Sequence, residues 1–341
     1  MQLSVVLPGP VSDRLPEAAQ ESEKAGLYRL WTTESPGRDA VLRASVLLGA
    51  TRTLAAGTGI SFAFARQPLA AAGLAADAYE LSGGRFSLGL GAGTRGQRRW
   101  YGVDFDHPAA RMADYVRALR AIWAGDGRAR YQGPFYDIDV PRVQLAGTPA
   151  SRAGLKVYGG GLHPRMLRAV ADSCDGVVLH PLAGGPRYLD DVVLPAIAAA
   201  PDRAPGFRLV VWCPLSVDFD AELARRRAAE QLAFYFATPS YRDVAGSAGY
   251  GAVADELVDR FNNGGAGFAE LAPLIPDGML DHFVVHGTPA QVADRLAARR
   301  TAWAERGVDE VALQIPAQSV TSDSLLDSIG QLAATVLPRF A

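Results

Sequence analysis

Glycines cluster in this sequence where a chain can receive a ligand close to its backbone. Within residues 54–93, two apolar segments of strand type both end in glycines. These glycines are Gly57, Gly59, Gly89, Gly91 and Gly93. Because glycine carries no Cβ, a flat ligand can lie against the backbone at such positions. The pattern therefore predicts a surface for a planar group at the ends of two strands.

A third glycine run, Gly159-Gly160-Gly161, leads into a segment of helical pattern that begins near Pro164. The N–H groups of such a turn and of the helix start can converge on a phosphate. Lys156 and Arg165 stand close by in the sequence as charge donors. We interpret the run as an anion site, and the alternative is a plain tight turn.

The segments around the first glycines form a strand–helix–strand unit. Leu54–Ser61 is apolar, as a strand buried on both faces should be, and Pro68 begins a helix rich in alanine and leucine. Ser82-Gly83-Gly84 ends that helix, and Phe86–Leu90 is the next buried strand. Such a unit implies parallel strands joined by a crossover helix.

The same alternation runs through the rest of the chain. Further strands are expected at Leu3–Leu7, Tyr28–Thr32, Lys156–Tyr158, Gly176–Leu179, Leu209–Pro214 and Glu310–Ile315. Further helices are expected at Arg14–Ala25, Ala40–Ala50, Ala109–Trp123, Pro164–Ala171, Arg187–Ala200, Ala221–Phe236, Pro289–Arg306 and Ser324–Leu337. This alternation predicts a closed (β/α)8 TIM barrel. An open doubly wound sheet is the alternative, but no GxGxxG follows the first strand.

Two segments interrupt the alternation. Residues 125–155 contain glycine, proline and aromatic residues without a helical period, and Tyr131–Val143 fits a small hairpin. Residues 238–283 contain a helical pattern at Val253–Asn262 and a weaker one at Ala269–Ile275. We expect both segments to be insertions in a single barrel domain that spans residues 1–341.

Composition excludes several classes of protein. The net charge of the 341 residues is −2 without a basic or acidic block, which argues against nucleic acid as a partner. No apolar run reaches 18 residues, and the first residues do not resemble a signal peptide, so neither membrane nor export is expected. Cys174 and Cys213 each lie in an apolar stretch and are expected to be buried thiols of a cytoplasmic protein.

Short motifs stand in one order along nearly the whole chain. They are Ala25-Gly26 with Trp31 and Glu34, Gly57-Thr58-Gly59-Ile60 with Arg66 and Pro68, Ser82-Gly83-Gly84-Arg85-Phe86, Leu88-Gly89-Leu90-Gly91, Arg111-Met112 to Trp123, Asp175-Gly176-Val177 and Gly287-Thr288-Pro289-Ala290-Gln291-Val292. Together they resemble the bacterial luciferase-like monooxygenase family, and more narrowly its coenzyme F420-dependent oxidoreductase branch.

The resemblance implies a TIM barrel, often a homodimer, that binds F420 or FMN. It implies a non-proline cis peptide at Gly59-Ile60, behind the deazaflavin ring of F420, where the alternative is an ordinary trans strand. The residues expected to contact the cofactor are Gly59, Ile60, Ser61, Gly91, Gly93, Thr94, Gly159, Gly160 and Gly161. Both cofactors carry a phosphate, so the last three glycines do not choose between them.

The loop after the second strand holds the candidate catalytic residues Glu34 and Ser35. Similar proteins often have an acid and a histidine here, but this chain has no histidine before His107. Glu34 is a candidate to donate or accept a proton in a buried setting. The alternative is a structural role, as a partner of Arg38 or of the threonines that precede it.

A basic segment follows the fourth strand. F420 has an anionic oligoglutamate tail that FMN lacks, and arginines such as Arg95 and Arg98 suit it. The alternative is a solvated basic loop. Trp100 and Tyr101 come next and are expected either to wall a substrate pocket or to anchor the loop on the barrel.

One histidine is a further candidate for the site. His180 follows the sixth strand, so it is expected to face the mouth of the barrel and contact substrate or phosphate. No histidine or cysteine has a partner at metal-ligand spacing, so no metal is predicted.

The function expected from these residues and the resemblance is F420-dependent hydride transfer to an activated C=C or C=N bond of a small molecule or peptide. A dehydroamino acid in a natural-product intermediate is one such acceptor. An FMN-dependent monooxygenase is the first alternative, and a non-catalytic luciferase-like subunit is the second.

Overall fold

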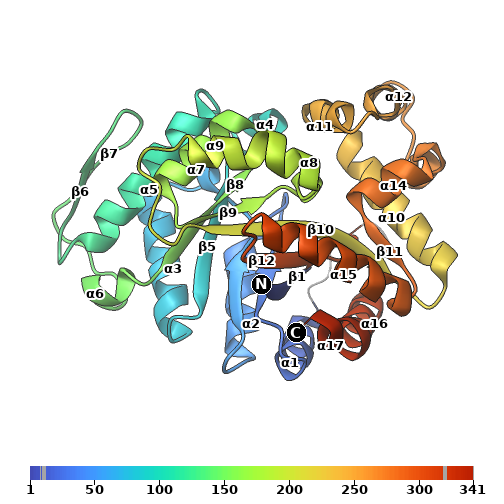
Figure 1. Ribbon diagram of the computed structural model, residues 1–341. Coiled ribbons are helices and arrows are strands. Elements are labelled where there is room, and N and C mark those ends of the chain that lie inside the picture. Colours follow the sequence, from blue (N-terminus) through green and yellow to red (C-terminus); the bar gives the residue numbers. More distant parts are fainter. Residues whose placement is uncertain (8, 10–12, 318–320, 341) are drawn as a thin grey trace.

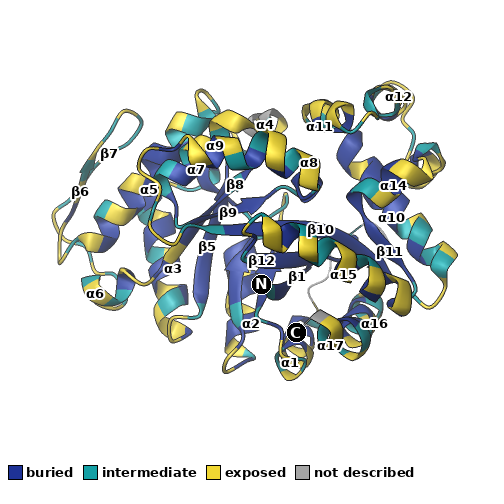
Figure 2. Ribbon diagram, viewed as in Figure 1, coloured by how far each residue is buried: buried dark blue, intermediate teal, exposed yellow. Residues whose placement is uncertain are grey.

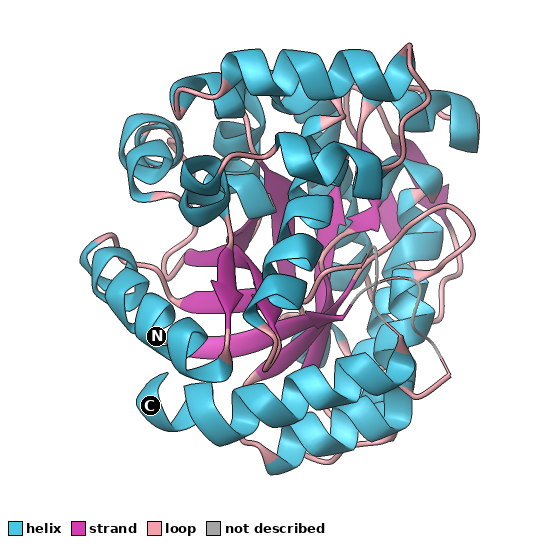
Figure 3. Ribbon diagram, turned by 90° about the vertical axis from the view of Figure 1, so that its right-hand side faces the viewer, coloured by secondary structure: helices cyan, strands magenta, loops and turns pink. Residues whose placement is uncertain are grey.

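The structure is a computed structural model that describes residues 1–7, 9, 13–317 and 321–340 (Figure 1), with residues 95, 97, 98 and 340 described by their backbone alone. Its centre is a barrel of parallel strands enclosed by helices, as Figure 3 shows. The barrel strands are β1 (Gln2–Leu7), β2 (Arg29–Thr32), β3 (Ala55–Thr58), β5 (Phe86–Gly91), β8 (Lys156–Gly161), β9 (Gly176–Leu179), β10 (Arg208–Val217) and β12 (Glu310–Gln314).

The sheet closes on itself. Neighbouring strands pair in the order β1, β2, β3, β5, β8 and β9, and β10 pairs with both β9 and β12. β12 then pairs with β1, where Gln2 is in register with Glu310. The (β/α)8 barrel is confirmed, and the doubly wound alternative is wrong because that sheet would have two open edges.

Helices cover the outside of the barrel. The longer ones are α1 (Leu15–Lys24), α2 (Ala40–Gly49), α3 (Pro68–Leu81), α5 (Pro108–Ala124), α7 (Pro164–Ser173), α10 (Ala221–Phe236), α12 (Gly251–Asn262), α15 (Pro289–Glu305) and α16 (Ser322–Gln331). Several begin at capping side chains: Asp39 accepts from the N–H of Leu42 in α2, and Thr288 and Gln291 form a capping box in α15. The sequence marked these helix starts correctly.

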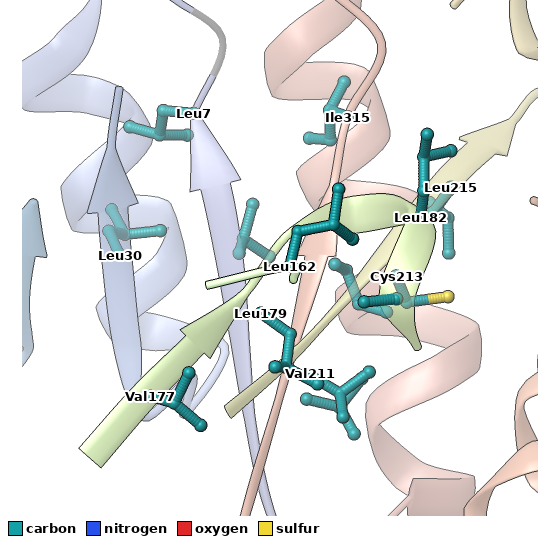
Figure 4. Packing of buried hydrophobic residues seen from close by; sticks show 14 of the residues in the cluster. Leu7, Leu30, Leu162, Val177, Leu179, Leu182, Val211, Cys213, Leu215 and Ile315 are labelled. Carbon is teal, nitrogen blue, oxygen red and sulfur yellow. The ribbon is translucent and has the colours of Figure 1, made fainter. Parts of the chain in front are cut away.

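Alternating residues of the strands build two separate cores. Leu30 and its counterparts on other strands point outward and pack under the helices, as Figure 4 shows for part of that layer. The neighbouring residue, Trp31, points inward with Val6, Tyr158 and Trp212. Figure 2 shows the result: the strands are buried on both faces, and exposed residues lie on the outer sides of the helices. This arrangement explains why the strands read as continuous apolar runs.

A buried ion pair lies at the end of the barrel where the strands begin. Trp31 Nε1 donates to Glu310 Oε1 at 2.8 Å, and Arg29 Nη1 lies 3.7 Å from Glu310 Oε2. The Arg29 guanidinium also lies 4.6 Å from the ring centre of Trp31 and 5.3 Å from that of Tyr158. This end of the barrel is therefore filled by side chains, and the opposite end is left for a ligand.

The two interrupting segments have structure of their own. The predicted hairpin is present as β6 (Ala129–Gln132) and β7 (Asp137–Val140), and α6 (Pro149–Arg152) follows it. The later segment folds as α11 (Arg242–Ser247), α12, α13 (Phe268–Leu271) and α14 (Asp277–Phe283), and β11 (Val285–Gly287) follows. Figure 1 places the hairpin and these helices on opposite sides of the barrel.

Three local predictions are corrected. The expected strand Leu54–Ser61 is divided into β3 and β4 (Ser61–Phe62). The expected helix Arg187–Ala200 consists of α8 (Pro186–Tyr188), a π-helical turn and α9 (Leu194–Ala198), because Pro195 has no N–H to continue an α-helical ladder. The arginine segment is a helix, α4 (Arg95–Tyr101), and not a loop.

Candidate active site

Glycines shape the end of the barrel where the strands finish. A Cβ on Gly59 would lie 2.4 Å from Trp212 Cζ2, and a Cβ on Gly91 would lie 2.6 Å from Ile60 Cδ1. A Cβ on Gly160 would lie 3.1 Å from Ile60 Cγ2. These glycines therefore make room for two large side chains, Ile60 and Trp212, which form the floor of the barrel mouth. The peptide bond between Gly59 and Ile60 is cis, as the resemblance implied.

The expected turn at Gly159–Gly161 is wrong. All three glycines lie in β8, paired with Val177 to Leu179 of β9. A Cβ on Gly159 would lie 2.4 Å from Val170, and one on Gly161 would lie 2.7 Å from Leu167, so these two glycines let α7 pack closely on the strand. Gly160 alone points toward the mouth. That any of them contacts a phosphate stays a prediction.

Glu34 forms the most connected polar group at the mouth. Its carboxylate accepts from Arg66 Nη1 at 2.8 Å, from Ser61 Oγ at 2.6 Å and from the N–H of Phe62 at 3.3 Å. The Glu34 side chain is 3% exposed and that of Arg66 21%. The backbone N–H of Glu34 donates to the carbonyl of Ile60 at 3.2 Å, which connects the loop after β2 to the floor.

The sequence did not indicate Arg66 as the partner of Glu34, because the two residues lie 32 positions apart. The second amino group of Arg66 binds the Asp39 carboxylate, so one guanidinium bridges two acids. Burial lowers the pKa of Arg66, but hydrogen bonding and charge from Glu34, then from Asp39, outweigh it and raise that pKa. The structure thus supports the structural reading of Glu34, with Arg66 as the partner.

Ser35, the second candidate catalytic residue, lies beside this cluster. Its N–H and carbonyl form a short bridge with the backbone of Arg38, and its side chain is half-buried. A Cβ on Gly9 would lie 3.3 Å from Ser35 Oγ. The catalytic roles of Glu34 and Ser35 stay predictions.

The segment after β5 reaches the same region through its aromatic residue. The Tyr101 ring meets the Phe62 ring edge to face at 5.5 Å, and burial followed by the charge of Glu34 raises the pKa of Tyr101. Trp100 is 64% exposed and points away from the core. Gly93 is exposed, Thr94 is half-buried, and both precede α4. The side chains of Arg95 and Arg98 lie outside the described residues.

His180 follows β9 at the end where the strands finish, and its ring lies within an aromatic group; that it contacts substrate or phosphate stays a prediction. Its ring lies 4.3 Å from the Tyr241 ring and 5.3 Å from the Tyr235 ring. Tyr235 donates its hydroxyl to Gln314 Oε1 at 2.7 Å. Burial, with a smaller contribution from His163, lowers the pKa of His180 to about 3, so the ring is neutral near pH 7.

Sequence reasoning missed Trp212 and the partners of His180. Trp212 was detectable, because it alternates with Val210 along an apolar strand and so had to point into the barrel. Tyr235 and Tyr241 were not detectable, because they come from α10 and the turn after it. Only the folded chain brings them over the end of β9.

The residues present fit a flat cofactor. The floor of Ile60 and Trp212 is apolar, and polar groups stand around it: Glu34, Arg66, His180 and Gln314. No group of three or more His, Cys, Asp or Glu among the described residues is placed to hold a metal ion. In the same part of the chain, none of the helices combines the length and the apolar character that a membrane span requires.

A barrel whose mouth joins an apolar floor to a rim of polar side chains is the framework of an enzyme that binds a flat cofactor. The luciferase-like monooxygenase family matches residues 2–307, and the chain belongs to that family. A putative coenzyme F420-dependent oxidoreductase of Mycobacterium tuberculosis is 28% identical over 314 residues, which cover 86% of this chain and 88% of the relative. An uncharacterised protein of the same organism is 33% identical over 307 residues, which cover 86% and 89%.

Solved structures share the fold at low identity. The coenzyme F420-dependent tetrahydromethanopterin reductase of Methanopyrus kandleri has a TM-score of 0.83 at 18% identity, covering 100% of this chain and 99% of that one. The oxygenating constituent of 3,6-diketocamphane monooxygenase of Pseudomonas putida, in complex with FMN, has a TM-score of 0.69 at 15% identity, covering 99% and 98%. The relatives support an oxidoreductase, and the fold serves both cofactors.

Proposed function

We propose that this protein is a coenzyme F420-dependent oxidoreductase that transfers a hydride from reduced F420 to an activated C=C or C=N bond. The observation that carries the proposal is the floor of Ile60 and Trp212 beside the Glu34–Arg66 pair, a mouth with one flat apolar surface and one polar edge. The F420-dependent relative with 28% identity supports F420 as the cofactor.

The described residues divide the work of binding. Ile60 lies against the ring, and Gly160, whose Cα faces the mouth without a side chain, leaves room for it. Arg66, held by Glu34, presents hydrogen-bond donors at the edge of the ring, and Ser61 donates its hydroxyl to Glu34 and so helps to hold that acid in place. Arg95 and Arg98, whose side chains lie outside the described residues, are proposed from the sequence to bind the anionic tail of F420, and Gly93 and Thr94 lie in the backbone just before α4. Glu34 acts by holding its neighbours, and Ser35 stands next to it.

The bound cofactor supplies the hydride, and the chain supplies geometry and charge. Tyr101 and Phe62 cover one side of the mouth, and Tyr235 and Tyr241 cover the other, which limits the access of water to the reacting atoms. Arg66 keeps a positive charge at the edge of the ring, because an arginine side chain is protonated near neutral pH and its two acid partners raise its pKa further. Together these groups favour a substrate held flat between the two aromatic walls.

We further propose that two copies associate in the cytoplasm. The adjacent helices α2 and α3 carry exposed apolar residues on their outer sides, namely Leu42, Val46, Leu74 and Leu81. Exposed apolar residues on two neighbouring helices favour an interface at this side of the barrel. Sedimentation of wild type and of Leu42→Glu would report a dimer that the variant dissociates.

The experiment that tests the cofactor is a fluorescence titration with oxidised and reduced F420 and with FMN. Binding of F420 without FMN supports the proposal. Binding of FMN alone moves the protein to the oxygenases, the alternative that the FMN-bound structure of similar fold supports. Binding of neither overturns an enzymatic role and favours a non-catalytic subunit.

A matched pair of variants locates the site in that titration. Arg66→Gln removes the charge at the edge of the floor and is expected to weaken F420 binding about tenfold or more, because it removes a charge-assisted donor. Arg128→Gln is the control, since Arg128 pairs with Asp139 on the distant β6–β7 hairpin. Equal F420 affinity in both variants would mean that F420 does not bind at this mouth.

A further inference from the structure

One buried tryptophan differs from the others in its hydrogen bonding. The indole N–H of Trp31 donates to Glu310, that of Trp123 to the carbonyl of Ala72 and that of Trp303 to the carbonyl of Gly184. Trp212 is 6% exposed, and its buried Nε1 has no acceptor among the described residues. Buried N–H groups in proteins are almost always paired, so this one indicates a partner that the chain itself does not supply.

The unpaired N–H lies at the floor of the mouth. Trp212 Cζ2 is the atom that a Cβ on Gly59 would meet at 2.4 Å, and Nε1 belongs to the same edge of the indole. Gly59 is also hydrogen-bonded through its N–H to Thr32, at the end of β2. The donor of Trp212 therefore lies close to Gly59, in the region where the flat cofactor and its substrate are proposed to meet.

A second donor stands on the neighbouring strand. Val178 of β9 is in register with Val210 of β10, and both point into the barrel. Trp212 lies two residues beyond Val210 in β10, and His180 follows the end of β9. From this register we infer that the two side chains are neighbours at the mouth. The N–H of His180 still bonds the carbonyl of Gly161, so the strand keeps its direction up to this residue.

The ring of His180 is held as a neutral donor. Its Nδ1 accepts the N–H of Leu182 at 3.3 Å, which leaves the proton on Nε2. Contact with the tilted Tyr241 ring fixes the orientation of the His180 ring, and burial keeps His180 uncharged by lowering its pKa to about 3. Nε2 has no hydrogen-bond partner among the described residues, and the side chain is partly exposed.

We propose that Trp212 Nε1–H and His180 Nε2–H together bind one oxygen or nitrogen atom of the substrate, which is therefore a neutral carbonyl, unsaturated carbonyl or imine compound. This inference rests on the proposed hydride transfer and names the substrate group that this mouth recognises. Two neutral donors between aromatic walls suit an uncharged polar acceptor better than a phosphate or a carboxylate, which would call for cations.

The same pair assists the reduction. When the β-carbon of an unsaturated carbonyl accepts the hydride of reduced F420, a new C–H bond forms and the C=C electron pair moves toward the carbonyl, leaving negative charge on its oxygen. The two N–H groups stabilise that charge. A proton from solvent then reaches the α-carbon. The substrate has gained one hydride and one proton, which together are two electrons and two protons, and the cofactor is oxidised.

The test uses 4-nitrophenol as the probe, because its phenolate is a stable oxyanion of the right shape with an absorbance change on ionisation. In the F420-loaded protein labelled with 15N-tryptophan, the Trp212 indole resonance, assigned with Trp212→Phe, is expected to move downfield as probe is added. The resonances of Trp123 and Trp303 are expected to stay in place, because their N–H groups are already bonded.

Variants separate the two donors from the walls. Trp212→Phe and His180→Asn are each expected to weaken phenolate binding about tenfold, the usual effect of losing a hydrogen bond to a charged acceptor. Asn retains an acceptor for the N–H of Leu182, and His180→Gln, which restores a donor near Nε2, is expected to recover binding. Arg128→Gln, which changes a residue paired with Asp139 of the distant β6–β7 hairpin, is the control and is expected to bind as wild type does.

Two outcomes would overturn the donor pair. One is a wild type that does not bind the probe, and the other is unchanged affinity in both Trp212→Phe and His180→Asn. Repeating the titration without F420 distinguishes this failure from that of the proposed function. If F420 does not bind but the phenolate still moves the Trp212 resonance, then the donor pair stands and the F420 proposal falls.

Discussion

Glu34 and Arg66 lie 32 residues apart in the chain and 2.8 Å apart in the structure, on the loop after β2 and on the turn before α3. The same carboxylate also accepts hydrogen bonds from the hydroxyl of Ser61 in β4 and from the N–H of Phe62. One acidic side chain thus connects three segments around the end of the barrel. The pair holds the edge of the mouth in place, and this arrangement leads to the first prediction.

Glu34→Gln is expected to lower the free energy of unfolding by about 2 kcal/mol, because it leaves the half-buried Arg66 with Asp39 alone. Chemical denaturation measures the change. Glu256→Gln is the control: Glu256 pairs with Arg260 on an exposed helix, so a loss below about 0.5 kcal/mol is expected. Equal losses in both variants would contradict the buried role of Glu34.

Gly159→Ala is expected to change stability, whereas Gly160→Ala is expected to change cofactor binding. The first places a Cβ 2.4 Å from Val170 and is expected to cost about 2 kcal/mol of stability, because α7 must move away from β8. The second places a Cβ 3.1 Å from Ile60 at the open mouth, so stability is nearly retained and F420 binding weakens severalfold. Thermal unfolding and the F420 titration measure the two effects. If Gly159→Ala were as stable as wild type, Gly159 would not pack against α7, and the predicted turn at Gly159–Gly161 would be favoured again.

His180 is expected to make the protein less stable in acid. Its pKa is lowered from 6.5 to about 3, mainly by burial, so below pH 6.5 the unfolded chain takes up a proton that the folded chain excludes. Stability is complete above the unfolded pKa and is lost as the pH falls through it. Between about pH 7.5 and pH 5.5, wild type should lose about 1 kcal/mol more than His180→Asn. Parallel losses in the two proteins would mean that His180 is solvated.

Glu310→Gln is expected to destabilise the barrel strongly, by about 3–5 kcal/mol, because the buried Arg29 loses its charged partner. Trp31→Phe removes only the hydrogen bond to Glu310 and some volume, so a loss of about 1–3 kcal/mol is expected. Urea denaturation gives both values. A larger loss of stability in Trp31→Phe than in Glu310→Gln would show that packing, and not the ion pair, holds this end of the barrel.

The sequence was sufficient for the barrel and for the positions of most strands. Apolar runs bounded by glycine and proline mark β1, β2, β5, β9, β10 and β12, because a strand buried on both faces needs apolar residues throughout. The helix starts at Ala40 and Pro289 were also predicted correctly, and the structure shows that Asp39 and Thr288 cap them through residues three positions further on. These features depend on neighbours in the chain.

The glycines show where such reading stops. The sequence placed Gly159–Gly161 at a strand end, but the length of β8 decides that they lie within the strand. Which of them points outward follows from the register with β9, since successive residues face opposite sides of a sheet. A one-residue change in register would have exchanged their roles.

By itself the sequence determined the class of fold, the polar residues that could stand at the mouth and the resemblance that the family match confirmed. Only the tertiary structure decided that Glu34 pairs with Arg66, that the Tyr241 ring contacts the His180 ring, and that Trp212 keeps an unpaired N–H beside Gly59. These contacts join residues that lie 32 to more than 150 positions apart. They exist because closure of the barrel fixes which loops and strand ends meet, and local propensities carry no information about that meeting.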